Sequence, residues 1–123
     1  MTDAASLKLK IQIMRGDEIA MGPGKADLLD AIEQTGSISA AGRALGMSYR
    51  RCWMLVEVMN RCWSAPLVET SAGGTKGGGA KVTDMGQNVL GHYRALQDHM
   101  TSASQGPDWQ ALNTLLLAET DTH

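Results

Sequence analysis

Four consecutive residues carry the groups best suited to contact another molecule: Ser48, Tyr49, Arg50 and Arg51. Hydroxyl groups form hydrogen bonds, and guanidinium groups bind phosphate oxygens and the edge of guanine. Ser48 is suited to cap a helix that we predict from about 48 to 60. Arg50 and Arg51 then lie in its first turn, where they can meet a nucleic acid.

A helical wheel divides this predicted helix into two faces. The core face is predicted to hold Tyr49, Cys52, Val56, Met59 and Trp63. The outward face is predicted to hold Arg50, Arg51, Met54, Glu57 and Arg61. For Trp53, at the boundary, we favour packing over base contact. The outward residues near the N-terminus are therefore candidates to reach base edges or phosphates.

A shorter helix is predicted just before this one, from Ser39 to Leu45, with Ile38, Ala41 and Leu45 inward. Its alanines favour a helix, Ser37 or Ser39 can cap it, and Gly46 suits a left-handed C-cap. Two short helices joined by a tight turn are the layout of a helix-turn-helix, whose second helix enters the DNA major groove. An ordinary helical hairpin in another fold is the alternative from this stretch alone.

A hairpin is predicted after the two helices, with strands at about 67–70 and 80–83. The glycine-rich segment 72–79 between them does not have the order of a nucleotide-binding P-loop. Glycine leaves backbone N–H groups accessible to phosphate, and Lys76 and Lys81 add charge. The hairpin is thus predicted to be the wing of a winged helix-turn-helix, with a flexible connector as the alternative.

The remaining elements are predicted from hydrophobic periodicity. A strand with alternating apolar residues is expected over 7–13, its hairpin partner over 18–21, and a helix over about 25–34. A helix of about 84–103, capped by Thr83 or Asp84, exceeds what a small core needs, so we expect it to pair with its copy in a dimer. A last amphipathic helix is expected around Trp109 to Leu116, docked on the core or on the partner.

Composition bounds the class of protein. The chain has 123 residues, 43% hydrophobic and 20% charged, which suits one soluble globular domain. The net charge is −2, but residues 37–81 hold six basic and two acidic residues, or +4, against −6 elsewhere. A local basic surface favours phosphate contact. No segment could span a bilayer and no signal peptide is apparent, so we expect a cytoplasmic protein.

Catalytic and metal chemistry are not indicated. Cys52 and Cys62 lie on different faces of the predicted helix, too far apart for a disulfide, and are expected to be small buried thiols. Neither they nor the three histidines show a metal-ligand spacing. No nucleophile and base pair is visible either. We therefore expect no catalytic residue, no metal and no enzyme activity.

The motifs GSIS, MSYRRCW and GGTKGGGA occur in order within a segment that resembles the DNA-binding domain of the ModE family. The resemblance covers roughly Leu7 to Leu96. Members of this family are bacterial molybdate-responsive transcriptional regulators, with a winged motif similar to that of LysR-type regulators. The resemblance implies a dimeric winged helix-turn-helix whose recognition helix and wing contact a two-fold symmetric operator.

Carried over by position, the resemblance puts Ser48, Tyr49, Arg50 and Arg51 at the groove and Thr75, Lys76 and Gly77 on the flanking backbone. Full-length members also carry small β-barrel domains that bind molybdate or tungstate. About 20 residues follow the long helix here, too few for such a barrel, so we expect no cofactor. Regulation without that ligand, an oxyanion site elsewhere, or a signal from a separate protein are the alternatives.

The fold is therefore expected to be mainly α with small β-hairpins: a winged helix-turn-helix with an N-terminal hairpin and a long dimerisation helix. Residues 1–105 are expected to form the DNA-binding domain and 106–123 a short helical tail. The expected function is a homodimeric bacterial transcriptional regulator; a protein-interaction module without sequence-specific DNA binding and a molybdate-binding protein are the alternatives. The expected DNA-binding residues are Ser37, Ser39, Ser48, Tyr49, Arg50, Arg51, Met54, Thr75, Lys76, Gly77 and Lys81.

Overall fold

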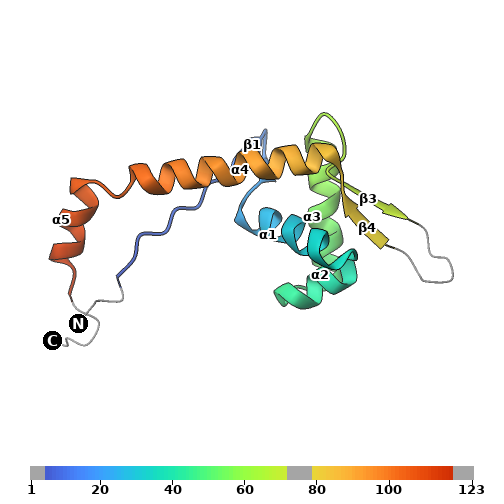
Figure 1. Ribbon diagram of the computed structural model, residues 1–123, viewed down its shortest axis with the longest axis horizontal. Helices are drawn as coiled ribbons and strands as arrows, with labels where there is room; N and C mark the ends of the chain where they lie inside the picture. Colours follow the sequence, from blue (N-terminus) through green and yellow to red (C-terminus); the bar gives the residue numbers. More distant parts are fainter. Residues whose placement is uncertain (1–4, 72–78, 118–123) are drawn as a thin grey trace. The chain divides into compact units, whose positions relative to one another are not determined.

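The computed structural model describes residues 5–71 and 79–117. The chain divides into two compact units: Lys10–Arg94 forms one, and Met1–Leu9 with Ala95–His123 forms the other. The secondary structure comprises β1 (Ile13–Arg15), β2 (Glu18–Met21), α1 (Pro23–Thr35), α2 (Ile38–Leu45), α3 (Tyr49–Cys62), β3 (Val68–Ser71), β4 (Gly79–Val82), α4 (Asp84–Ala103) and α5 (Pro107–Leu115) (Figure 1). The predicted fold, mainly α with two small antiparallel hairpins, is confirmed.

Local capping interactions define the helix-turn-helix. The Ser37 hydroxyl accepts a hydrogen bond from the Ala40 N–H at 2.9 Å, and the Ser48 hydroxyl accepts one from the Arg51 N–H at 3.1 Å. Gly46 ends α2 in the left-handed conformation, with φ of 67°, which glycine adopts without strain. Of the two caps considered for α2, the structure selects Ser37.

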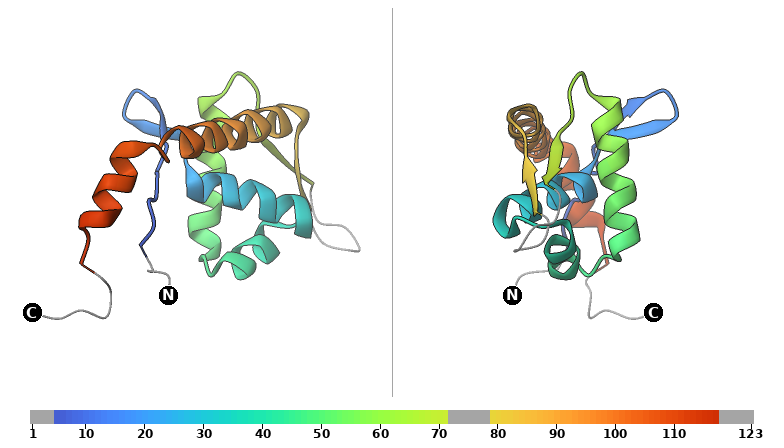
Figure 2. Two further views of the ribbon diagram at one scale, coloured as in Figure 1. Left: turned by 60° about the vertical axis from the view of Figure 1, so that its left-hand side comes forward. Right: turned by 90° about the vertical axis from the view of Figure 1, so that its right-hand side faces the viewer.

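Small residues let α2 and α3 approach closely. A Cβ atom at Gly42 would lie 2.9 Å from the Cys52 sulfur and 3.0 Å from the Met47 carbonyl oxygen, so only glycine fits there without displacement. In the right-hand view of Figure 2, α3 stands between the two hairpins, and it contacts β2 on one side and β3 on the other. α3 is therefore held by the rest of this unit along most of its length.

The core is formed by apolar residues from all three helices of the first half, the hairpins and α4. Its fully buried large side chains are Tyr93, Met21, Leu28, Leu29, Ile32, Met59, Leu67, Val56 and Cys52. Burial of this many large side chains, at roughly 1.5–3 kcal/mol each, is the main favourable term in folding. Because Cys52, Val56 and Met59 of α3 lie in this core, only the opposite side of α3 remains available for a partner.

Asn60 joins the end of α3 to the wing. Its side-chain oxygen accepts hydrogen bonds from the N–H groups of Leu67 and Val68, at 2.9 and 3.0 Å, and its amide donates to the Val68 carbonyl at 2.9 Å. Beyond the wing, a Cβ atom at Gly86 would lie 2.3 Å from the Leu67 carbonyl oxygen. The wing is thus fixed at its base by α3 and by the start of α4.

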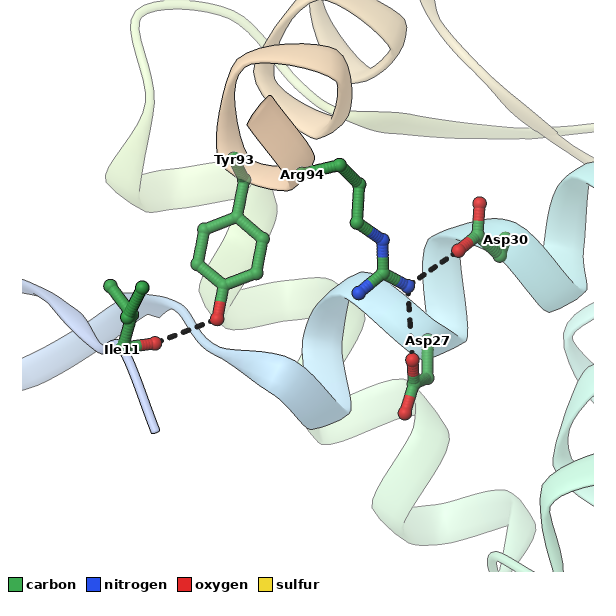
Figure 3. A network of polar contacts seen from close by, with 5 residues as sticks. All are labelled: Ile11, Asp27, Asp30, Tyr93 and Arg94. Carbon is green, nitrogen blue, oxygen red and sulfur yellow. Dashed lines mark hydrogen bonds and ion pairs between the residues drawn. The ribbon is translucent and has the colours of Figure 1, made fainter. Parts of the chain in front are cut away.

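Hydrogen bonds from Tyr93 and Arg94 hold the middle of α4 (Figure 3). The Tyr93 hydroxyl donates to the Ile11 carbonyl at 2.7 Å. The Arg94 guanidinium donates to Asp27 and Asp30 of α1 at 3.0 and 2.6 Å. Burial raises the pKa of the Tyr93 phenol, so the group stays a hydrogen-bond donor at physiological pH. Arg94 thus connects the long helix to α1, and Tyr93 connects it to the segment before β1.

The predicted strand over 7–13 is mostly wrong. β1 begins only at Ile13, because β2 has four residues and offers no partner further out. The core-face assignments of Tyr49 and Leu45 are wrong as well, since these side chains are 58% and 38% exposed. Both lie at helix ends, Tyr49 at the first residue of α3 and Leu45 at the last of α2, where the core no longer covers the helix surface.

The unit formed by Met1–Leu9 and Ala95–His123 contains the end of α4 and the whole of α5. Leu96 and Met100 are exposed and lie one helical turn apart on α4. The predicted last helix is present as α5, and none of its residues is buried. Leu112, Leu115, Leu116 and Leu117 are all exposed. Among the described helices, none has the length and apolar character needed to cross a membrane.

Candidate nucleic-acid interface

The first two turns of α3 present an exposed surface of two cations and a flexible apolar side chain. Arg50 and Arg51 are exposed, and Met54 is 55% exposed. Within the described ranges, neither arginine forms an ion pair or a side-chain hydrogen bond. Two guanidinium groups are therefore left with five donors each for an external acceptor.

Arg61, at the other end of α3, differs from these two arginines. Its Nε donates to Glu18 Oε1 at 3.3 Å, and a second guanidinium nitrogen pairs with the other carboxylate oxygen. The hydrogen bond from Arg61 lowers the pKa of Glu18, and its charge adds to the effect. The C-terminal end of α3 thus fixes its cation within the fold, whereas the N-terminal end leaves its cations available.

Tyr49 and Trp53 form an aromatic pair along α3. Their ring centroids are 6.1 Å apart with the planes at 78°, an edge-to-face contact. Trp53 is half-buried and packs against the core, which confirms its predicted boundary position. Tyr49 makes this contact at the first residue of α3, and its side chain remains 58% exposed.

A cleft of about 300 Å³ lies between the start of α2, the start of α3, the end of β3 and the start of β4. We call it the hydroxyl cleft; its polar and aromatic lining consists of Ser37, Ser39, Tyr49, Trp53, Thr70 and Ser71. The structure thus brings together three of the predicted DNA-binding residues, Ser37, Ser39 and Tyr49. Ser48 caps α3, and Arg50, Arg51 and Met54 occupy its exposed side.

Lys81 is placed differently from the residues of the cleft. It is exposed on β4, with Glu69 as its cross-strand partner, and it lines a separate hollow together with Glu69 and Asp84. Thr75, Lys76 and Gly77 lie outside the described residues. The predicted roles of Lys81 and of these three residues in DNA contact stay predictions.

Neither cysteine belongs to a binding centre in the described part of the chain. Cys52 is fully buried and Cys62 half-buried, both as free thiols. Burial raises the pKa of the Cys52 thiol, so it stays protonated, in keeping with the predicted packing role. A search of the described residues finds no group of three or more His, Cys, Asp or Glu side chains able to hold a metal ion.

Thr70, Ser71 and Arg43 were not among the predicted site residues. Thr70 and Ser71 line the cleft, and the Arg43 guanidinium donates to the Ser39 hydroxyl at 3.0 Å. Arg43 and Ser39 are four residues apart on a helix, a spacing that signals side-chain contact. The wing residues gave no comparable signal, because their approach to α2 depends on tertiary packing.

Comparison with curated proteins finds three informative relatives. The chain is 44% identical over 77 residues to the molybdenum-pterin-binding protein MopB of Rhodobacter capsulatus, covering 63% of this chain and 28% of that protein. It is 39% identical over 84 residues to the molybdenum transport protein ModE of Azotobacter vinelandii, covering 68% and 31%. It is 34% identical over 115 residues to the DNA-binding transcriptional dual regulator ModE of Escherichia coli K12, covering 91% and 42%.

The chain spans less than half the length of each of these relatives. A scan against protein-family models finds no match. The similarity to the Escherichia coli protein nevertheless extends over nearly all of this chain, and so includes the helix-turn-helix and the wing strands.

Proposed function

We propose that this chain, which belongs to the ModE family over its winged helix-turn-helix region, is a bacterial DNA-binding transcriptional regulator. The observation that carries the proposal is the pair of exposed arginines, Arg50 and Arg51, at the start of the second helix of the motif. In helix-turn-helix proteins this end of the recognition helix contacts base edges in the major groove. Arginine binds the guanine edge through two hydrogen bonds.

The relatives support control of genes related to molybdenum. One is named as a molybdenum transport protein, others as ModE transcriptional regulators. No cofactor forms part of the proposal, because contact with DNA through arginines and hydroxyl groups requires none. Regulators of this kind are not enzymes, and we propose that the protein binds rather than catalyses. Its site of action is the cytoplasm, where the DNA of a bacterium lies.

The proposed active form is a homodimer on a two-fold symmetric operator. Leu96 and Met100 on α4 and the exposed leucines of α5 support it, since apolar side chains of this number on two helices suit pairing with a second copy. In such dimers the two recognition helices occupy half-sites about one DNA turn, or roughly 34–36 Å, apart. The selected operator is therefore expected to be an inverted repeat.

Selection of bound duplexes from a random pool tests the function directly. We expect the wild-type chain to enrich a two-fold symmetric sequence, and the Arg50→Ala/Arg51→Ala variant to lose that enrichment. The Arg61→Ala variant is the matched control, because its guanidinium is already paired with Glu18. Enrichment of no sequence by the wild-type chain would favour a protein-interaction module instead. Calorimetry with molybdate on the same preparation tests the absence of a cofactor.

A further inference from the structure

Three serine hydroxyls of the hydroxyl cleft each accept a hydrogen bond from the protein. Ser37 Oγ accepts from the Ala40 N–H at 2.9 Å, and Ser39 Oγ accepts from the Arg43 guanidinium at 3.0 Å. Ser71 Oγ accepts from the Gly79 N–H at 3.2 Å. A hydroxyl oxygen that accepts in this way still has its own proton to donate.

Across the described residues, none of these three protons has an acceptor. Other hydroxyls of the same unit behave differently. Thr35 donates to the Ala31 carbonyl and Thr83 to the Pro66 carbonyl, each at 2.7 Å. The Ser48 hydroxyl, which caps α3 outside the cleft, resembles the cleft serines, because it accepts from the Arg51 N–H and none of the described residues accepts its proton. The cleft is therefore set apart by gathering three such hydroxyls in one lining, where all can donate to the same ligand.

The charge around the cleft favours an anionic acceptor. Its lining contains no carboxylate, and the Arg43 guanidinium lies against Ser39 at its edge. The start of α2, where helix N–H groups make the local potential positive, also faces it. By contrast, the hollow that Lys81 shares with Glu69 and Asp84 includes two carboxylates, which oppose a phosphate. The hydroxyl cleft therefore differs in charge from the hollow that Lys81 shares with Glu69 and Asp84. A third hollow along the wing strands includes Ser71 together with Glu69 and Lys81, one carboxylate and one cation.

We propose that the hydroxyl cleft binds a backbone phosphate of one DNA strand, with Ser39 of α2 and Ser71 of β3 as donors to its oxygens. The proposal rests on the DNA-binding function proposed above. A phosphate oxygen accepts hydrogen bonds and donates none, which matches three hydroxyl protons that no described residue accepts. A volume of about 300 Å³ leaves room for the adjoining sugar beside the Trp53 ring. Ser71 thereby becomes a DNA-contact residue on the wing.

A contact between a neutral hydroxyl and a phosphate can be recognised from how DNA affinity depends on salt and on sequence. Neutral hydroxyls release no counterion when they bind a phosphate, so this contact adds affinity without adding to the salt dependence. It is also independent of base identity. Its loss should weaken binding to every duplex by the same factor and leave the dependence on salt unchanged, whereas loss of a base-contacting arginine affects the selected duplex most.

The Ser39→Ala/Ser71→Ala variant tests the assignment in gel-shift titrations with the duplex selected above and with an unrelated duplex. We expect about a hundredfold loss on both, because the homodimer loses two neutral hydrogen bonds in each of its two clefts, with an unchanged salt slope. The Ser64→Ala/Ser102→Ala variant is the control, since both of these serines are exposed and lie outside the cleft. Ser71→Thr keeps a hydroxyl and should retain affinity.

Replacing single phosphates of the selected duplex by uncharged methylphosphonate identifies the contacted group. One position in each half-site should weaken the wild-type chain about tenfold and leave the double variant unaffected. If no position shows this coupling while the wild-type chain still binds, the cleft assignment is wrong and the proposed function stands. If the wild-type chain binds no duplex, both are wrong.

Discussion

The two faces of α3 use the same residue type in opposite ways. Met59 is fully buried in the core, whereas Met54, five residues earlier on the same helix, is 55% exposed. Cys52 and Val56 continue the buried face, and Arg50 and Arg51 continue the exposed one. The buried face stabilises the fold because its apolar side chains are removed from water. The exposed face adds little to stability, so its side chains are available to select a partner.

A second contrast runs along the helix. At its C-terminal end, Arg61 pairs with Glu18 and Asn60 bonds to the wing, so this end is committed to holding the fold. At its N-terminal end, Arg50 and Arg51 have no such partner within the described residues. One end of α3 thus positions the helix and the other is presented to a ligand, which is the arrangement that a DNA-reading helix requires.

The largest effect is expected from the buried methionine. Met59→Ala should lower the free energy of unfolding by about 2–5 kcal/mol, because it removes core contacts and leaves a cavity. Met54→Ala on the opposite face should change it by no more than about 0.5 kcal/mol. Urea unfolding followed by circular dichroism measures both. Equal losses in the two variants would show that the faces are not distinct.

The exposed arginines should show the reverse behaviour. Arg50→Ala or Arg51→Ala should weaken binding to the selected duplex by about 1–3 kcal/mol for each lost base contact. The free energy of unfolding should stay within about 0.5 kcal/mol of the wild-type value. Fluorescence anisotropy gives the affinity and urea unfolding the stability. A variant that binds normally would remove that arginine from the proposed interface, and Arg61→Ala provides the comparison on the same helix.

The alkylation rates of the two cysteines can compare the buried face of α3 with its C-terminal end without any mutation. Cys52 is fully buried and its thiol pKa is raised by burial, whereas Cys62 is half-buried at the end of the helix. Iodoacetamide reacts with the accessible thiolate, so Cys62 should be alkylated faster by about tenfold or more. Peptide mass spectrometry over a time course measures both rates. Comparable rates in the native protein would mean that the Cys52 side of α3 opens readily.

The smallest effect is expected from the exposed ion pair. Hydrogen bonding to Arg61 lowers the pKa of Glu18 in the folded chain. The pair therefore stabilises the fold above the unfolded pKa of the carboxyl group and loses this contribution as the pH falls through the lowered folded pKa. Arg61→Gln should be slightly less stable than wild type at pH 7 and indistinguishable from it in strong acid. High salt should also remove the difference.

The helices and the turn could be predicted from the sequence because their signals are local. Ser37 and Ser48 cap helices by accepting hydrogen bonds from N–H groups three residues away. Gly46 adopts the left-handed conformation at the end of α2 without strain. The apolar period of α3 likewise placed Val56 and Met59 inward. The same apolar periodicity also predicted which side of α3 is exposed. The candidate residues for contact with the DNA groove lie on that side.

Contacts between distant segments could not be predicted. Alternating apolar residues suggested a strand over 7–13, but β2 pairs only as far as Ile13. The carbonyl of Ile11 is instead used by Tyr93, 82 residues away in sequence. Exposure of Tyr49 and Leu45 was also missed, since periodicity gives a side chain's direction and not how far the core extends to cover it.

By itself, the sequence determined the helix-turn-helix, its caps and the two arginines that it presents, because each depends on residues within a turn or two of one another. Only the tertiary structure decided that Arg61 is paired while Arg50 and Arg51 have no partner among the described residues, since Glu18 lies 43 residues from Arg61. It alone also placed Ser71 of the wing and Ser39 of α2 in the lining of one cleft. A binding cleft requires surfaces from separate elements, and their approach is fixed by the packing of the whole core.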